Sequence, residues 1–503
     1  MEFSFLTHLV SGFESAFRPH NLFFAFMGSL LGTVVGVLPG IGPSGAIAMV
    51  LPIILFVGDP TSTIIMLAAT YAGAMYGGST TSILLNVPGE SASVVACLDC
   101  HQMALQGRAG PALCIAAIGS YIAGSLGIVG LMLLAPWLAD FALRFGPPEY
   151  GALYIFGLSA VAALSGTNIS KGMIAMIIGL VLSTVGADLT GVERFMFESE
   201  FLLDGIELLA VPIGLFALSE VLINARDVRA NVVREVMKYR IYISWAEIKE
   251  SLGAIFRGGF VGFFVGVLPG AGASIASFIS YSIEVQTSKT PEKFGKGEIK
   301  GLAGPEAANN AASAGSLVPM LSLGVPGSGS TAVMLVALIA MDVSPGPLMF
   351  QKNPEVVWGL IAALYIGNIM LLVLNLPLVG IFVRILYIPM RILLPAIIVI
   401  AVVGVYSKNH SEIDLFVMCG LGLLGFYMRR NSYPLAPIIL GFVLGQRLEE
   451  ALRQTVIQYR YEPWQLLEKH IAIFFAVMAI AFLFLPIFLK RFSKTKFQPE
   501  DDA

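Results

Sequence analysis

The sequence contains few charged residues. Only 13% of its 503 residues are Asp, Glu, Lys or Arg, whereas 56% are hydrophobic. A soluble protein needs far fewer apolar residues to build its core. The formal net charge of −3 favours neither nucleic acid nor an anionic membrane surface as a partner. The composition therefore predicts a polytopic membrane protein.

Motifs for ATP hydrolysis and for catalysis are missing too. The chain has no GxxxxGK[ST] loop, no HExxH and no GxSxG, and its five histidines lie near the ends of expected segments. Its four cysteines include one CxxC, at Cys97 and Cys100, without a second pair to complete a zinc site. We expect no metal site, no cofactor and no enzymatic activity. An intramembrane enzyme is the least favoured alternative.

Apolar stretches long enough to cross a bilayer recur along the chain. Each span needs roughly 17–25 residues, so we expect an all-α fold with about 11–14 spanning or half-spanning helices. The first residues, including Glu2, His8 and Glu14, lack the basic start and cleavage site of a signal peptide. We expect this segment to remain in the mature protein.

Two short motifs each occur twice inside these apolar stretches. GVLPG stands at 36–40 and at 266–270, and NVPG at 86–89 is matched by GVPG at 324–327. The order is the same in both halves and the spacing nearly so, which predicts an internal duplication. The alternative is that membrane helices rich in Gly and Pro resemble one another by composition alone.

Loop charges predict that the two repeats have inverted topology. The connection at 56–63 has no Lys or Arg, whereas its counterpart at 286–301 has four lysines. Basic residues are retained in cytoplasmic loops, so we expect the first loop outside and the second inside. The connection after the second motif carries His101 and Arg108 in the first half but Lys352 alone in the second half. These residues indicate the reverse orientation for this connection, inside in the first half and outside in the second. This is the charge pattern of an inverted repeat.

One polar stretch divides the halves. We predict a first transmembrane repeat at 1–224, a cytoplasmic polar linker at 225–257, a second repeat core at 258–394, and C-terminal helices with a cytoplasmic tail at 395–503. If the linker and 286–301 are both cytoplasmic, the segment between them must enter and leave the membrane by the same face. A hairpin bent at 268–270 or two short full passes would satisfy this.

The Pro and Gly residues of the four motifs are expected to break helices. In lipid, a broken backbone is tolerated only inside protein or beside water, so the breaks should line an interior site. After each break a new helix should begin, and its first N–H groups favour an anion. Helix capping and close packing are the alternative explanation. The candidate substrate-binding residues are Gly40, Gly42, Ser44, Thr80, Thr81, Asn86, Pro88, Gly89, Ser91, Gly270, Gly272, Ser274, Asn309, Asn310, Pro326, Gly327 and Ser328.

Two carboxylates stand beside the breaks. Glu90 and Glu306 are candidates for ion coupling, because a carboxylate at membrane depth is costly unless it binds Na⁺ or a proton. Asp59, Asp188 and Asp342 are expected at helix ends instead. Four interrupted helices in inverted halves favour alternating access, with a passive channel as the alternative.

The same residues resemble the large transmembrane subunit of the tripartite tricarboxylate transporter family (TctA-like). The resemblance covers essentially the whole chain, with one departure, CLDCHQ at 97–102, which leaves the role of that loop open. The matching stretches are GVLPGIGPSGAIAMVLP (36–52), YAGAMYGGSTTSILLNVPGE (71–90), QGRAGPAL (106–113), GVLPGAGASIASFISYSIE (266–284), GPEAANNAASAGSLVPMLSLGVPGSGSTAVML (304–335) and PGP (345–347).

The resemblance implies a secondary transporter of the bacterial inner membrane. It would import carboxylates such as citrate or a dicarboxylate, driven by a Na⁺ or H⁺ gradient. The implied partners are a small four-helix membrane subunit and a periplasmic solute-binding protein. The family's glycine-rich signatures carry over to Gly36–Ser44 with Asn86–Ser91, and to Gly266–Ser274 with Asn309, Asn310 and Gly324–Ser328. A passive carboxylate channel is the second choice.

Overall fold

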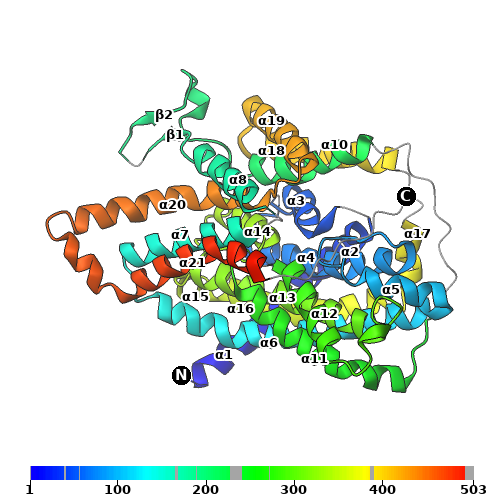
Figure 1. The fold of residues 1–503 in the computed structure, drawn as a ribbon. Helices are drawn as coiled ribbons and strands as arrows, with labels where there is room; N and C mark the ends of the chain where they lie inside the picture. Colours follow the sequence, from blue (N-terminus) through cyan, green and yellow to red (C-terminus); the bar gives the residue numbers. More distant parts are fainter. Residues whose placement is uncertain are drawn as a thin grey trace.

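The chain folds almost entirely into helices (Figure 1). The computed structural model describes residues 2–38, 41–55, 57–164, 168–188, 190–226, 241–270, 272–385 and 390–492. Within these ranges one two-stranded antiparallel hairpin, β1 with β2, projects beyond the helices. The all-α polytopic fold expected from composition is confirmed.

The helices and strands follow one another in two stretches around the polar linker. The first comprises α1 Glu2–Ala16, α2 Pro19–Gly36, α3 Gly42–Leu55, α4 Pro60–Leu85, α5 Cys97–Met103, the π-helix η1 Ala104–Arg108, α6 Ala109–Ala142, α7 Pro147–Leu164, α8 Ile169–Leu182, β1 Gly186–Ala187, β2 Glu193–Arg194, the 3-10 helix η2 Glu200–Leu202, α9 Ala210–Pro212, the π-helix η3 Ile213–Leu218 and α10 Ser219–Arg226. The second comprises α11 Trp245–Val267, α12 Gly272–Thr287, the 3-10 helix η5 Pro291–Lys293, α13 Ile299–Leu323, α14 Gly329–Ala340, α15 Met349–Lys352, α16 Pro354–Asn375, α17 Val379–Ile385, α18 Met390–Asn409, α19 Glu412–Arg430, α20 Ala436–Gln458, the 3-10 helix η6 Pro463–Glu468 and α21 His470–Phe492.

Equivalent glycines pack one helix tightly onto another in each half. A methyl group added to any of these glycines would overlap a backbone carbonyl of the facing helix, so only Gly permits the approach. In the first half α2 packs parallel to α4, and in the second half α11 packs parallel to α13. The matched pairs are Gly28 with Met66, Gly32 with Thr70 and Gly36 with Ala74, against Gly258 with Gly304, Gly262 with Ala308 and Gly266 with Ala312. Because the same positions make the same contacts, the predicted duplication is confirmed.

One end of the molecule, here called the lysine-rich end, is formed by residues 97–108, 241–250 and 286–301. Arg108 Nη2 donates a 2.9 Å bond to Glu247 Oε1 in the first turn of α11, and Gln106 Nε2 donates one of 2.8 Å to Lys296 O. The three segments whose basic residues predict a cytoplasmic position therefore lie together. Since α11 starts here and α12 returns here, these two helices form a hairpin.

The other end, here called the opposite end, is formed by residues 15–21, 57–63 and 341–355. Ser62 Oγ donates a 2.7 Å bond to Asn21 Oδ1, so α2 and α4 start together, and Arg18 pairs with Glu355 at 2.6 Å. The 26 residues of α4 cover about 39 Å at 1.5 Å per residue. Near its far end, Ile83 O lies 3.0 Å from His101 Nδ1 of the lysine-rich end. The hairpin of α2 and α3 thus enters from the end opposite to that of α11 and α12.

Three helical stretches among the described residues are long and apolar enough to cross a membrane: Cys97–Ala142, which joins α5, η1 and α6, Trp245–Val267 and Pro354–Asn375. α3, at 14 residues, and α12, at 16, are shorter than the roughly 20 residues that a full pass needs. The short second helix of each hairpin favours a turn inside the protein, which for the second hairpin is the first of the two predicted alternatives.

Candidate functional site

The hairpin tips meet where α4 and α13 run antiparallel in the centre. There Asn309 Nδ2 donates a 2.7 Å bond to Glu90 Oε1. At the equivalent positions of the other half, the hydroxyl of Tyr71 lies 3.4 Å from Ser328 Oγ. Each pair joins one half to the other, and exchanging the halves turns one pair into the other. The two repeats are thus related by an approximate two-fold axis through this site.

A second set of contacts follows the symmetry approximately. Ser91 Oγ lies 2.6 Å from the Oγ of Ser274, which is at the start of α12. Ser44, at the start of α3, is equivalent to Ser274, and its Oγ lies 3.1 Å from Ser330 Oγ. Ser330 follows Gly329, the equivalent of Ser91. Three predicted hydroxyl groups, those of Ser44, Ser91 and Ser274, therefore lie at the interface between the halves.

The two predicted ion-coupling residues share this centre. Ser79 Oγ donates a 2.6 Å bond to Glu306 Oε2, and the side-chain amide of Asn309 lies between Glu306 and Glu90. Both carboxylates are buried, and no ion pair among the described residues includes either of them. Asn309 Oδ1 is also buried and accepts no bond from the described part of the chain. The cluster offers oxygens without a positive charge to balance them.

The two VPG motifs fold back into the protein after α4 and α13 end. Asn86 and Gly324 cap these helices in the left-handed conformation, with φ of 56° and 69°. The chain then returns inward until Gly89 packs against Gly78. In the second half, a methyl group added at Gly327 would lie 2.8 Å from the Cα of Ser316. The prolines Pro88 and Pro326 lie within these returning segments, where they donate no backbone bond.

A helix begins after three of the four breaks, but not after Gly89. α14 follows the second VPG motif with a capping box between Ser328 and Thr331, whereas residues 90–96 form turns. The prediction of a helix there was wrong. Glu90 stands where Ser328 stands in the other half, and it binds Asn309 instead of capping a helix.

The remaining candidates occupy different surroundings. Gly42, Gly270 and Gly272 have φ of 65°, 79° and 60°, which a side chain would strain. Within the described residues, the hydroxyl of Thr81 bonds to Gly78 O of its own helix and to no other group, and Thr80 is buried beside α6. Gly40 lies outside the described residues.

The two neighbouring asparagines point apart. While Asn309 faces Glu90, Asn310 Nδ2 donates a 2.7 Å bond to Ser120 Oγ of α6. Asn310 and Tyr71 line an internal cavity of about 30 Å³, large enough for one water molecule and far too small for a tricarboxylate. This cavity therefore cannot hold the substrate in the conformation described.

Sequence reasoning missed several residues of this centre. They share hydroxyl groups on the buried faces of the two central helices or of α14, and they are Tyr71, Ser79, Ser316 and Ser330. The duplication carried a signal for one of them, because Tyr71 is the repeat equivalent of Asn309. The others lie in helices buried on every side, which leave no polar stripe in the sequence.

The CLDCHQ segment at 97–102, which departs from the family pattern, has a structural role at the lysine-rich end. Asp99 Oδ1 accepts bonds of 2.9 and 2.8 Å from the backbone N–H groups of Gly297 and Glu298, and Tyr281 donates one of 3.0 Å to Oδ2. The four cysteines are free thiols. Asp99 therefore fixes the lysine-rich loop against α5.

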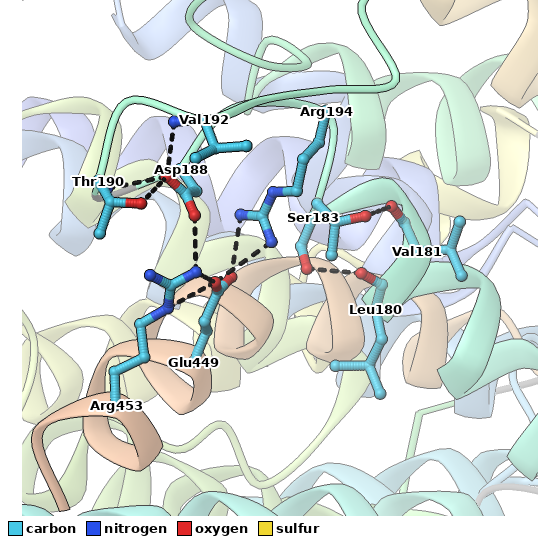
Figure 2. Close-up of polar contacts among 10 residues, drawn as sticks. Leu180, Val181, Ser183, Asp188, Thr190, Val192, Arg194, Glu449 and Arg453 are labelled. Carbon is cyan, nitrogen blue, oxygen red and sulfur yellow. Dashed lines mark hydrogen bonds and ion pairs between the residues drawn. The ribbon is translucent and has the colours of Figure 1, made fainter. Parts of the chain in front are cut away.

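The β hairpin is attached to α20 by a network of ion pairs (Figure 2). Arg453 Nη2 lies 2.6 Å from Asp188 Oδ2, and Arg194 pairs with Glu449 at 3.1 Å. The hydroxyl of Thr190, with the N–H of Val192, holds the pKa of Asp188 well below its usual range. As predicted, Asp188 lies at the edge of a loop; likewise Asp59 caps α4, and Asp342 follows α14.

Comparison with known proteins places these features in a family. Residues 22–440 match the tripartite tricarboxylate transporter TctA family. A protein of Agrobacterium vitis, described as an uncharacterized 52.8 kDa protein in the TAR-I ttuC' 3'region, is 45% identical over 453 residues, which are 90% of each chain. A second, described as an uncharacterized protein in the TAR-II ttuC' 3'region of the same organism, is 46% identical over 196 residues, 39% of this chain and 81% of that protein. No solved structure matches the chain. The chain belongs to the TctA family of tripartite tricarboxylate transporters.

Proposed function

We propose that this chain is the large membrane subunit through which a tripartite transporter imports carboxylates across a bacterial inner membrane. A small four-helix membrane subunit and a periplasmic solute-binding protein would complete the transporter. Uptake would be coupled to a gradient of Na⁺ or H⁺. The observation that carries the proposal is the pair of buried carboxylates, Glu90 and Glu306, bridged by Asn309 at the interface between the two halves.

Coupling follows from the charge of this cluster. Two buried carboxylates without a cationic partner are costly in a medium of low dielectric constant, so a proton or Na⁺ that neutralises them stabilises the closed centre. Asn309 Oδ1 supplies a further acceptor. If the halves move relative to each other, the cation enters from one end and leaves by the other. Substrate movement can then draw on the ion gradient.

Substrate binding is supported by the helix starts around the same centre. α3, α12 and α14 each begin here, and Ser44, Ser274 and Ser330 add hydroxyl groups at their first turns. Backbone N–H groups at helix starts bind carboxylates, and small residues let the ligand approach them. The cation and the anionic substrate would also neutralise each other's charge.

Uptake into vesicles tests the proposal. The chain is reconstituted with both partner subunits, and accumulation of citrate and of succinate is measured under an imposed Na⁺ gradient, an imposed pH gradient or neither. We expect at least one carboxylate to accumulate above its external concentration only under one of the gradients. Equal uptake without any gradient would support a passive channel and contradict the proposal.

A further inference from the structure

Arg447 of α20 lies between two cavities at the opposite end of the molecule. One has a volume of about 470 Å³, and Tyr150, Tyr154 and Ser344 are among its lining residues. The other, of about 690 Å³, has three acidic residues in its wall, Asp204, Glu207 and Asp414, which oppose an anion. Both volumes lie within the roughly 300–1,000 Å³ of small-molecule sites. Arg447 is the one Lys or Arg in either lining, and the 470 Å³ cavity is the one suited to an anion.

Glu449 and Arg453 of α20 take part in ion pairs, whereas Arg447 does not. Glu449 binds Arg194 and Arg453, and Arg453 also binds Asp188 (Figure 2). None of the ion pairs found within the described ranges includes Arg447. A half-buried guanidinium that forms no ion pair with the described residues is suited to an anionic ligand.

Polar side chains around Arg447 fit the same ligand. The hydroxyl of Tyr154 interacts with the guanidinium, and Ser344 lines the same cavity. Glu450 also lines this cavity, where its Oε1 accepts a 3.0 Å bond from Gln454 Nε2. That exposed carboxylate opposes an anion, so removing its charge should not weaken binding.

The position of Arg447 connects this cavity with the centre. A side chain added at Gly324 would lie 3.2 Å from Arg447 Nη1. Gly324 begins the segment that returns inward to Ser328, which faces Tyr71 in the centre. Arg447 therefore lies beside the buried start of the second VPG motif. Stabilisation of the carbonyl end of α13 is the simpler role for a cation at this place.

We propose that Arg447, with Tyr154 and Ser344, binds one carboxylate group of the substrate at the entrance of the 470 Å³ cavity, before the substrate reaches the centre. The planar guanidinium can hold both oxygens of a carboxylate at once. This inference rests on the proposed function, because it takes the substrate to be a carboxylate.

Chemical protection of Arg447 tests binding without requiring transport. The purified full chain is treated with phenylglyoxal, which modifies accessible arginines, and modification of each arginine is followed by mass spectrometry. Citrate or succinate should slow modification of Arg447 and leave that of Arg460 unchanged, while glycerol should protect neither. Equal modification of Arg447 with and without both carboxylates would overturn the inference, whatever the vesicles transport.

Uptake by variants tests the role in transport. Losing a charged hydrogen-bond partner costs about 1.5–3 kcal/mol, so Arg447→Ala should raise the citrate or succinate concentration for half-maximal uptake by at least about tenfold. The half-maximal concentration of Arg447→Lys should lie between those of Arg447→Ala and wild type. That of Glu450→Gln should equal the wild-type value or be lower. Arg460→Ala is the control, because Arg460 is exposed and lines neither cavity.

An unchanged half-maximal concentration in Arg447→Ala would contradict the inference. A lowered maximal rate with an unchanged half-maximal concentration would also contradict it, because that result indicates that Arg447 only stabilises the carbonyl end of α13. Gradient-independent uptake by the wild type would instead overturn the proposed function, while protection of Arg447 would still decide the inference.

Discussion

Asn309 in the second half donates a 2.7 Å hydrogen bond to Glu90 in the first. The repeat equivalents of these two residues, Tyr71 and Ser328, form a contact of two hydroxyl groups at 3.4 Å. The duplicated backbone thus carries a carboxyl group bound to an amide on one side of the two-fold axis and two hydroxyl groups on the other. Ion binding should therefore belong to one side of the centre, although the fold around it is symmetric.

Glu90→Gln and Glu306→Gln should reduce gradient-driven uptake by at least about tenfold, because each amide keeps the shape of the carboxylate but cannot be neutralised by a cation. Uptake of labelled carboxylate into vesicles is the measurement. Glu292→Gln, in the exposed lysine-rich loop, should behave as wild type. Full gradient-driven uptake in both glutamine variants would exclude the two carboxylates from coupling.

Gly89→Ala should destabilise the protein by about 1–3 kcal/mol, because the new methyl group would overlap Gly78. Gly327→Ala should destabilise the protein similarly, because its methyl group would overlap Ser316. Thermal unfolding and uptake are measured for each variant. Gly420→Ala is the control, since no atom lies within 4 Å of a methyl group added there. Wild-type stability and uptake in both variants would contradict the close return of the VPG motifs.

Asp99→Asn should loosen the lysine-rich loop. The substitution removes the charge that accepts two backbone bonds and one from Tyr281, and bonds to a charged group contribute about 1.5–3 kcal/mol each. Hydrogen exchange should become faster at 288–298 and stay unchanged in α4. Tyr281→Phe removes one bond of the three and should have a smaller effect. Unaltered exchange in Asp99→Asn would show that the loop is held by other contacts.

Much of the fold could be predicted because it depends on residues with strong local effects. The GVLPG and VPG motifs break helices whatever surrounds them, so their places and the duplication were visible in the sequence. Loop lysines also grouped the correct segments at one end. The segment after Gly89 could not be predicted in this way. Glu90 is equivalent to the capping residue Ser328, and its partner, Asn309, lies 219 residues away.

The centre was predicted only in part, for a related reason. Glycines and hydroxyl groups beside the breaks were recognisable, whereas Ser79 and Tyr71 lie in a helix that is buried on all faces. Such a helix has no polar stripe to mark its functional side. Asp99 was uninformative for another reason: its partners, Tyr281, Gly297 and Glu298, lie more than 180 residues away in the sequence.

The pH dependence of the β hairpin follows from the lowered pKa of Asp188. A carboxylate whose pKa is lower in the folded protein stabilises it above the unfolded pKa, about 3.9 for Asp, and this contribution is lost as pH falls through the folded pKa. A spin label on Phe197→Cys should therefore keep the same mobility from pH 7 to pH 4. Asp188→Asn should increase its mobility already at pH 7, while Glu193→Gln should not. Equal mobility in Asp188→Asn would show that the ion pair does not hold the hairpin.

A reversible cross-link between the two halves tests the central claim most directly. Ser91 and Ser274 come from different halves, and their hydroxyl oxygens lie 2.6 Å apart. In the double variant Ser91→Cys with Ser274→Cys, oxidation should form a disulfide, stop gradient-driven uptake and be reversed by a reducing agent. Each single variant should continue to transport under oxidising conditions. Full uptake by the cross-linked protein would contradict the claim that carboxylates pass between two halves that move apart.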